Sequence, residues 1–563
     1  MKDIDLPFVG LHAHSTFSLN DGFGYPQEHQ KFAYENGMNA LALTDHGTCA
    51  GLSYAILNAK KMREEGKDFK AILGVEAYFI PDVIEWREIY EEIKKDKKAA
   101  RALKKRESTI TAETDGSSRE SNNTTLPRYA HLILFAQNQV GLNNIYSIVS
   151  ESHDEKHFYR RPRVDFNLLR KYNEGVICAS ACLGGIVGRE MYSGRDAGLN
   201  EEQIYQNALA KLKTFSDIYG DRFYGELQWN SVPEQHIVNK MVIRASKEIG
   251  IRIISTADSH YPTQDAWRDR EMYKRLGWLS RGTPSWMTDD DMKMPESVDA
   301  IGYELYPKNG QQMWESYRKY SEECGVEYDD DLVRDSITLT HWIAHEQVED
   351  FEVDTTVQLP DFVVPEGQTA DNALTSMSIE GLKSKGLTSQ EYIDRLKYEL
   401  DVIHTQGFSK YFLTMKAIAD KASEIMATGP ARGSASGSLL AYVLNITQVD
   451  PVRFGLPFER FMTRDMKGMP DIDFDVSEPA LLKEKLAEEW GEFSVVPISN
   501  WNTLQLKSLI KYVSKLYNIK YTEVDKVTKV MLFEATPAAK KAHGIKAGVY
   551  TPTWEEVMLY SPT

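Results

Sequence analysis

Short apolar segments alternate with helical segments through the first 260 residues, and this alternation constrains the fold more than any other feature. ALALTD (40–45), AILGVEAYFI (71–80) and HLILFAQN (131–138) are typical of buried strands. Between them, EHQKFAYENGM (28–38) and SYAILNAKKMREEG (53–66) are typical of helices. Strands that alternate with helices predict an α/β domain.

Residues 84–126 interrupt this alternation, and we interpret them as a surface insertion. Segment 84–107 is a charged helical run with eight basic residues between Lys94 and Arg106, and 108–126 is rich in Ser, Thr and Asn. A solvated charged helix is the simpler interpretation of the basic run, and an arm that contacts DNA is the alternative.

Composition narrows the setting in which the chain works. The formal charge is −17, from 66 basic and 83 acidic residues, which argues against nucleic-acid binding by the whole surface but not by a local cleft. No run approaches the ~18 apolar residues of a membrane span, and the N-terminus lacks the pattern of a secretory signal. Because four cysteines are too few for a disulfide framework in so long a chain, we expect a reducing cytoplasm.

Candidate metal ligands lie at or near the ends of almost every predicted strand of the first domain. His12 and His14 are two residues apart, as are Asp258 and His260, a spacing that points both side chains of a strand to one side. A single histidine near a strand is usually a hydrogen-bonded core residue, but repetition at successive strand ends favours a multinuclear metal site. The remaining candidates are Asp45, His46, Glu76, His131 and Cys182, and the mixture suits zinc, manganese or iron alike.

A second cluster joins a Gly/Ser loop to a row of carboxylates. The loop begins GPARGSASGSLLAY (429–442), where small residues let backbone N–H groups approach phosphate oxygens and Arg432 adds positive charge. In the later MPDIDFD, a strand would place Asp471, Asp473 and Asp475 on one face. Carboxylates in such a row repel each other unless a cation neutralises them, so the pair of motifs suggests two-metal phosphoryl transfer.

The second half of the chain is mainly helical. The sequence predicts that residues 262–345 are mostly helical and that 346–372 form an extended connector. Thr388 and Glu391 match a capping box, and Gly407 follows the end of the helix that they begin.

Three lysines near the C-terminus, Lys507, Lys511 and Lys515, have the spacing of one helical stripe. From 501 to 563 there are nine lysines and five acids, a local charge of +4. A solvated lysine face is one interpretation, and a stripe that follows DNA phosphates is the other.

The domain that carries the candidate metal ligands resembles the PHP (polymerase and histidinol phosphatase) domain. This domain stands at the front of bacterial C-family replicative DNA polymerases, the DNA polymerase III α-subunit family. The resemblance rests on GLHAHSTFSLNDG, LTDHG, GVEAY, HLILFAQN, SACLGG and TADSHY. It implies a metal-competent site that hydrolyses phosphoesters, associated in the family with 3′→5′ exonuclease proofreading. The nine ligand positions of the family match His12, His14, Asp21, His46, Glu76, His131, Cys182, Asp258 and His260.

The segment with the Gly/Ser loop and the row of carboxylates resembles the palm of the same family. GFSKYFL (407–413), the Gly/Ser loop, FERF (458–461) and MPDIDFD recur in the family's order, and VQLPDFVVPEG (357–367) resembles the lead-in to its palm. The resemblance implies that Mg²⁺ is held by Asp471 and Asp473, two of three catalytic carboxylates. It also implies that the incoming triphosphate is held by Gly433 and Ser434, to which we add Arg432 and Ser436.

Several family features are missing from this sequence. The third catalytic aspartate, the fingers, the sliding-clamp-binding motif and the OB-fold region are absent, and the chain stops in a segment that resembles the thumb, where Tyr512 replaces a common acid. We therefore expect an amino-terminal piece of a split polymerase, or a truncated chain, which polymerises efficiently only with a carboxyl-terminal fragment. Primed DNA and dNTPs are the expected substrates, and a sliding clamp would be reached only through the missing regions.

These observations predict a PHP (β/α)7-like barrel, a mixed α/β nucleotidyltransferase-type palm and a helical thumb. We place the PHP metallophosphoesterase at 1–280, the first part of the palm at 281–485 and a truncated thumb at 486–563. The leading function is DNA-directed DNA polymerase, with a phosphoesterase site that binds Zn²⁺, Mn²⁺ or Fe²⁺. The alternatives are a stand-alone PHP nuclease or phosphatase, and a non-catalytic DNA-binding half of a split polymerase.

Overall fold

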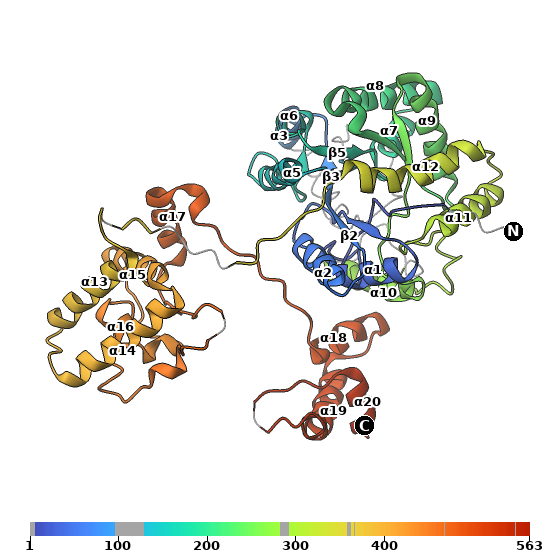
Figure 1. The fold of residues 1–563 in the computed structure, drawn as a ribbon. Coiled ribbons are helices and arrows are strands. Elements are labelled where there is room, and N and C mark those ends of the chain that lie inside the picture. The colour runs from blue at the N-terminus through green and yellow to red at the C-terminus, as the bar shows by residue number, and fades with distance from the viewer. Residues whose placement is uncertain are drawn as a thin grey trace. The chain divides into compact units, whose positions relative to one another are not determined.

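The computed structural model describes residues 6–95, 129–281, 292–356, 362–364, 366–466, 468–546 and 548–562. The predicted Ser/Thr/Asn-rich segment 108–126 lies outside these ranges, as does most of the basic run before it. The chain forms two compact units (Figure 1). Unit 1 is Met1–Val353 with Leu504–Thr563, and unit 2 is Asp354–Thr503.

Unit 1 is built on a seven-stranded sheet in the order β1-β2-β3-β5-β6-β7, with β4 paired to β2. Strand β3 runs antiparallel to both of its neighbours, and all other pairs are parallel. The strands are β1 (Ala40–Leu43), β2 (Lys70–Phe79), β3 (Ala130–Ala136), β4 (Arg163–Val164), β5 (Val176–Ala179), β6 (Phe223–Leu227) and β7 (Arg252–Ser255).

The amino-terminal segment joins the two edges of this sheet. We predict a strand for FVGLHAHS, but it forms only isolated parallel bridges, from Gly10 to Leu41 of β1 and from Ala13 to Ser259 beyond β7. The sheet therefore curls round on itself, as in a barrel.

Helices between the strands confirm the alternation predicted from the sequence. All residues of β2 and β3 are buried, as expected for strands covered on both faces. The helices up to residue 353 are α1 (Pro26–Glu35), α2 (Leu52–Glu64), α3 (Val83–Lys95), α5 (Gln139–Ser152), α6 (Phe166–Lys171), α7 (Ile186–Asp196), α8 (Glu201–Tyr219), α9 (Pro233–Ile249), α10 (Trp267–Arg281), α11 (Gly310–Glu323) and α12 (Asp330–Trp342).

The carboxyl-terminal helices α18 (Leu506–Val513), α19 (Tyr521–Ala542) and α20 (Trp554–Tyr560) also belong to unit 1. Tyr512 of α18, where the family commonly has an acid, donates a hydrogen bond to the Leu276 carbonyl of α10 at 3.3 Å. No helix in the described part of the chain combines the length and apolarity needed to cross a bilayer.

Unit 2 is helical in its described residues, with one isolated antiparallel bridge between Thr428 and Val476. The MPDIDFD segment is thus extended but does not join a sheet. Its helices are α13 (Ala370–Ser384), α14 (Gln390–Gln406), α15 (Ser409–Ile425), α16 (Leu439–Val443) and α17 (Pro479–Trp490).

Helix α14 forms between the two predicted end signals, but its start differs from the prediction. Ser389 occupies the cap position, with no side-chain capping bond, so Thr388 and Glu391 do not form the expected capping box. The end is as predicted, because Gly407 adopts the left-handed conformation at φ 74°.

Candidate metal centre and carboxylate loop

The nine side chains predicted as metal ligands converge in unit 1. Contacts no longer than 3.8 Å link them all, although they come from separate segments between residues 12 and 260. The cluster consists of His12, His14, Asp21, His46, Glu76, His131, Cys182, Asp258 and His260.

Glu76 lies at the centre of the cluster. Its Oε2 is 2.7 Å from His46 Nδ1 and 3.1 Å from His14 Nε2, and its Oε1 is 2.7 Å from His131 Nδ1. Cys182 Sγ lies 3.7 Å from the same nitrogen of His131. One buried carboxylate is thus shared among three imidazoles, an arrangement suited to bridging two cations.

Asp258 and Asp21 extend the cluster on the side of the last strand. Asp258 Oδ1 is 3.0 Å from His12 Nε2 and 3.4 Å from His260 Nδ1. Asp21 Oδ2 is 3.4 Å from His260 Nε2 and 3.3 Å from His46 Nε2. Every carboxylate therefore faces at least two imidazoles.

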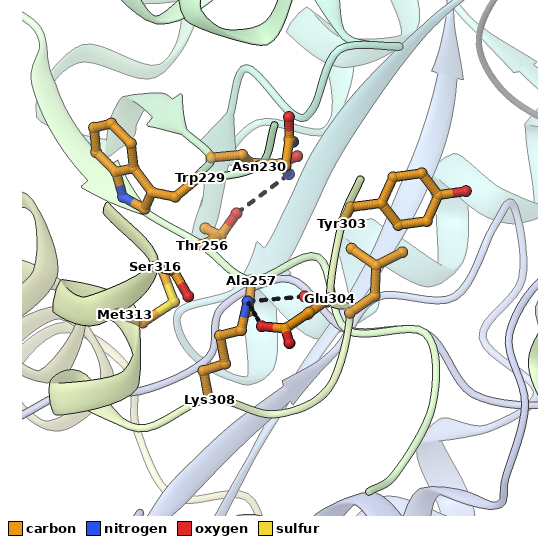
Figure 2. A pocket seen from close by; sticks show the side chains of 11 residues that line it. Trp229, Asn230, Thr256, Ala257, Tyr303, Glu304, Lys308, Met313 and Ser316 are labelled. Carbon is orange, nitrogen blue, oxygen red and sulfur yellow. Dashed lines mark hydrogen bonds and ion pairs between the residues drawn. The ribbon is translucent and has the colours of Figure 1, made fainter. Parts of the chain in front are cut away.

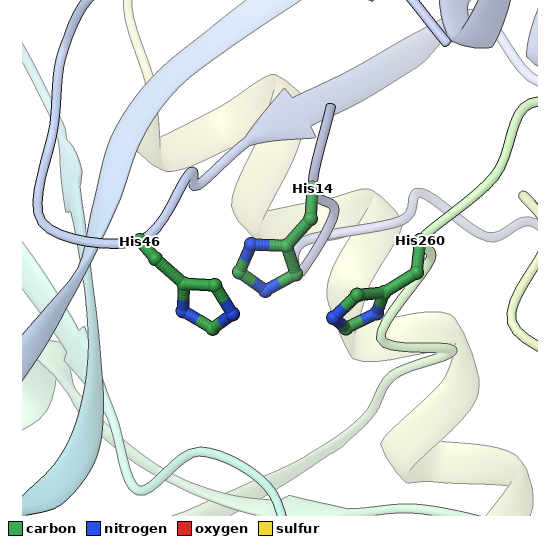
Figure 3. Close-up of side chains that lie close together, drawn as sticks. All are labelled: His14, His46 and His260. Carbon is green, nitrogen blue, oxygen red and sulfur yellow. The ribbon is translucent and has the colours of Figure 1, made fainter. Parts of the chain in front are cut away.

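Figure 3 shows three of the imidazoles, from His14, His46 and His260, side by side. The ring centroid of His14 is 4.2 Å from that of His46 and 4.4 Å from that of His260. Their ring nitrogens include atoms that all lie within 4.8 Å of one another, close enough to share a cation.

Several polar atoms of this cluster lack hydrogen-bond partners within the protein, and a divalent cation would satisfy them. Both carboxylate oxygens of Glu76 and Oδ1 of Asp258 are buried and accept no hydrogen bond, and His260 Nε2 is buried without a hydrogen-bond partner. Leaving such groups unsatisfied costs about 1–3 kcal/mol each, and more when they are charged. Imidazole, carboxylate and thiol together are the donor set of zinc, manganese or iron sites.

The electrostatics of the cluster favour charged forms despite burial. Burial alone would raise the pKa of Glu76, but His131 and His46 hold that pKa well below its ordinary value. Burial alone would lower the pKa of His12, but Asp258 and Glu226 raise that pKa well above its ordinary value. The Glu76 carboxylate is therefore held in its negative form, and a cation bound beside it would displace the proton that the raised pKa keeps on His12.

Three residues hold the ligands in place, and sequence analysis does not identify them as such. Glu226 Oε1 is 2.8 Å from His12 Nδ1, Arg270 is ion-paired with Asp21, and Asp45 accepts from Ser18, whose hydroxyl is 3.0 Å from His14 Nδ1. Both carboxylate oxygens of Asp45, one of the candidate ligands, accept hydrogen bonds from Ser15 or Ser18, so this residue orients His14 through Ser18. A buried Glu226 inside an apolar strand is the one sequence signal that could have pointed to such a role.

Asp258 has a strained backbone. Its φ is +47°, a region that residues other than glycine rarely adopt. Such strain persists where the surrounding structure enforces it, and it clusters at functional sites.

A small cavity lies apart from these nine residues, between the end of β6 and the segment before α11 (Figure 2). Its volume of about 10 Å³ leaves room for one water molecule. Lys308 lines it and bonds to the Glu304 carbonyl at 2.9 Å, and burial lowers the pKa of this amine to about 8. The cavity is too small for a substrate.

In unit 2, the predicted carboxylates stand beside the Gly/Ser loop. Asp471 and Asp475 are exposed and Ile472 is buried, whereas Asp473 and Phe474 are both half-buried. The predicted alternation therefore holds only in part, and without a ladder. Gly433 has φ +64°, and a Cβ there would collide with Oδ2 of Asp473. The loop backbone therefore touches one carboxylate.

Other residues of the loop have partners within the loop or its neighbour. Arg432 is 3.1 Å from Asp475 Oδ1, and Ser436 donates to the Gly433 carbonyl at 2.9 Å. Ser434 begins the short 3-10 turn that precedes α16.

A buried glutamate that the sequence analysis does not identify supports this loop. Glu399 of α14 accepts from the backbone N–H groups of Leu439 and Leu440 and from the Ser438 hydroxyl, each at 2.9 Å. Arg395 donates to it at 2.7 Å. Glu399 thus joins the start of α16 to α14, while Asp471 and Asp475 beside the loop stay exposed.

The three lysines near the C-terminus do not form the continuous helical stripe predicted for them. Helix α18 ends at Val513, so Lys515 lies in the 3-10 turn that follows. Lys511 is ion-paired with Asp525 and bonds to the Tyr521 hydroxyl at 3.1 Å. DNA contact by Lys507, Lys511 and Lys515 stays a prediction.

Two family models match the chain. Residues 10–230 match the PHP domain, and residues 372–551 match the bacterial DNA polymerase III alpha NTPase domain.

Curated relatives match along most of the chain. DNA polymerase III subunit alpha of Aquifex aeolicus is 31% identical over 93% of the chain, and that of Borreliella burgdorferi is 31% identical over 93%. The subunit of Thermus aquaticus is 28% identical over 93%. The match covers 41%, 40% and 43% of these relatives, so the chain spans about two fifths of their length.

Proposed function

We propose that unit 1 hydrolyses phosphodiester bonds at the 3′ end of DNA. The premise is that this chain is homologous to the amino-terminal region of bacterial DNA polymerase III alpha subunits and carries a PHP domain. The observation that carries the proposal is the convergence of nine ligand-type side chains around buried carboxylate oxygens that accept no hydrogen bond.

The nine clustered residues would hold the divalent cations. Bound cations supply charge that stabilises the phosphate and lowers the pKa of a coordinated water. Glu226 and Ser18 fix the ring orientations of His12 and His14, and Arg270 occupies one oxygen of Asp21 and leaves the other facing the imidazoles. Zn²⁺, Mn²⁺ and Fe²⁺ all suit this donor set.

The test uses the purified chain, a single-stranded oligonucleotide labelled at its 5′ end, and each cation added after chelation. We expect stepwise shortening from the 3′ end that EDTA stops and that Glu76→Gln abolishes. Glu202→Gln, which changes an exposed carboxylate far along the chain on α8, is the matched control and should retain activity. Absence of shortening with every cation would overturn the proposal.

We also propose that unit 2 contributes to nucleotidyl transfer. The observation in favour is the contact between Gly433 and Asp473 next to the exposed Asp471. In this proposal Asp471 and Asp473 hold Mg²⁺, and Gly433, Ser434, Arg432 and Ser436 bind the triphosphate of a dNTP. Primed DNA is the second substrate, and Arg432 has to leave Asp475 to reach a phosphate.

A carboxyl-terminal polymerase fragment is the partner that we propose, because the relatives are more than twice as long as the match. Mixing the chain with such a fragment should give primer extension that neither gives alone, and Asp471→Asn should remove it. Robust extension by the chain alone would refute the need for a partner. Since the relatives come from bacteria, we place the activity in the cytoplasm of a bacterium or of a phage-infected cell.

A further inference from the structure

Arg163 is buried and its guanidinium lacks the partners that such a group requires. The residue is 2% exposed, and its Nη1 and Nη2 are buried with no hydrogen-bond partner. Only Nε is satisfied, by the His157 carbonyl at 2.9 Å. A guanidinium cannot shed its charge in a protein, so a buried one needs an acceptor.

Aromatic side chains hold this guanidinium without supplying an acceptor. Its Cζ lies 4.0 Å from the ring centroid of Trp86 and 5.5 Å from that of Tyr159. Tyr90 stacks on Trp86 with centroids 5.3 Å apart and an interplanar angle of 10°. The rings attract the cation through their faces but offer no lone pair in hydrogen-bond geometry. They therefore fix its position and leave Nη1 and Nη2 unsatisfied.

Two acidic side chains close to Arg163 in the sequence accept hydrogen bonds from other groups. Asp165, two residues along the chain, accepts from the backbone of Val83 and Leu168. Asp154 accepts from the backbone of Lys156 and His157 and pairs with the imidazole of His157. Within the described residues, no carboxylate lies within ion-pair distance of Arg163.

A second arginine adds positive charge to this region. Arg87 of α3 donates to the backbone carbonyls of Glu155, Lys156 and Phe158, and not to a carboxylate. Burial, together with the positive charge of Arg87, lowers the pKa of Arg163 to about 10. Two arginines that act on each other electrostatically and have no carboxylate partner among the described residues attract an anion with several oxygen acceptors.

The side chain of Tyr78 lies between Arg163 and the candidate metal centre. Tyr78 pairs with Arg163 across β2 and β4, and its ring lies 6.0 Å from that of His46. The guanidinium of Arg161 also lies over the Tyr78 ring, with its Cζ 5.2 Å from the ring centroid. An anion held at Arg163 would therefore lie one residue away from the ligand cluster.

We propose that Arg163 and Arg87, backed by Trp86, Tyr90 and Tyr159, form a phosphate-binding subsite beside the metal centre. The ligand is a phosphate group, carried by a nucleic-acid strand or by a free nucleotide or inorganic phosphate. Trp86 is covered by Arg163 and Tyr90, so the subsite grips phosphate and does not stack a base. Its role in positioning a strand rests on the proposed hydrolysis, whereas phosphate binding itself does not.

The first measurement is thermal unfolding in EDTA with inorganic phosphate or chloride at equal ionic strength. Phosphate should raise the Tm of the wild type and of Glu76→Gln, and should not raise that of Arg163→Met. The matched control is Arg244→Met. Arg244 also lies over an aromatic ring, Tyr205, at 3.7 Å, but it is paired with Glu202, so its loss should leave the phosphate shift intact.

The second measurement is fluorescence anisotropy of a labelled single-stranded oligonucleotide in EDTA, where no hydrolysis occurs. If the phosphate belongs to a strand, Arg163→Met should weaken binding at least tenfold and reduce the salt slope by roughly 0.7 for the lost contact. A phosphate shift with unchanged oligonucleotide binding would assign the subsite to free phosphate or nucleotide. If Arg163→Met does not fold, Arg87→Gln takes its place in both measurements.

Absence of a phosphate shift in the wild type, or an equal shift in Arg163→Met, would overturn the subsite. Neither measurement depends on metal or catalysis. A failure here is therefore distinguishable from a failure of the proposed hydrolysis, which the EDTA-sensitive shortening assay tests separately.

Discussion

Two buried glutamates, one in each unit, show how differently the same side chain is used. Glu76 and Glu399 are both 0% exposed. The oxygens of Glu399 are saturated by two backbone N–H groups, a hydroxyl and an arginine, whereas those of Glu76 accept no hydrogen bond and face imidazoles. The first pattern is typical of a structural carboxylate and the second of a metal ligand. In unit 2 the carboxylates predicted for chemistry are instead in or next to the exposed loop.

The largest effect on folding should come from Glu399→Ala. It leaves the N–H groups of Leu439 and Leu440 buried without an acceptor, which costs about 3–5 kcal/mol in all. Arg395 loses one partner but keeps the carbonyls of Gly437 and Leu456. Urea unfolding, with hydrogen exchange at α16 to locate the loss in unit 2, measures it. Glu399→Gln retains one acceptor oxygen and should cost less. An unchanged free energy of unfolding would contradict the structural role of Glu399 that distinguishes it from Glu76.

Glu76→Gln should weaken the binding of Zn²⁺ or Mn²⁺ by about 100-fold, since it removes the charge that faces three imidazoles. The loss corresponds to about 2.7 kcal/mol of the stabilisation that metal gives to unit 1. Calorimetric titration and the Tm shift on metal addition measure it. Glu399→Gln is the matched control, because it also neutralises a buried glutamate. Equal weakening in both variants would contradict the distinction drawn here.

Metal affinity should rise with pH. The pKa values of His12 and His46 are raised, and a cation binds only after these rings lose their protons. Affinity should fall about tenfold per pH unit for each proton displaced as the pH drops below those values. Without metal the sign reverses, because raised histidine pKa values stabilise the fold at low pH and this contribution is lost as the pH rises through them. Tm measured from pH 6 to 9 with EDTA or with Zn²⁺ separates the two trends.

The smallest effect concerns the loop of unit 2. Gly433→Ala places a Cβ at φ +64° and against Asp473, and should cost somewhat more than the about 1 kcal/mol expected for the backbone alone. Gly455→Ala is the matched control, since Gly455 has φ +61° and open space around it. Urea unfolding of both variants isolates the contact with Asp473. Equal costs would show that the loop does not press on this carboxylate.

Much of unit 1 could be predicted because its signals are local. Strand periodicity and the His12/His14 and Asp258/His260 spacing identify the sheet and most of the ligands. Glu226, Arg270 and the supporting role of Asp45 could not be predicted, since each acts through a partner up to 249 residues away. Such pairing depends on tertiary packing that spacing does not reveal.

In unit 2 the same reasoning was less complete. The alternation of Ile472 with its flanking aspartates is predicted, but sheet pairing is not a local property and the segment stays outside a ladder. In the sequence, nothing distinguishes Glu399 from a solvent-exposed acid on an amphipathic helix. Its role becomes evident only when the start of α16 packs against α14, and the lysine stripe fails because α18 ends before Lys515.

The bridges from the amino-terminal segment to both edges of the sheet have a consequence for biosynthesis. His12 and His14 leave the ribosome well before their partners Asp258 and His260, which are translated some 246 residues later. Contacts so distant in sequence form late and slowly. Tight metal capture can therefore begin only once the whole ring of strands has emerged, and uptake of a cation by nascent chains would time the closing of this domain.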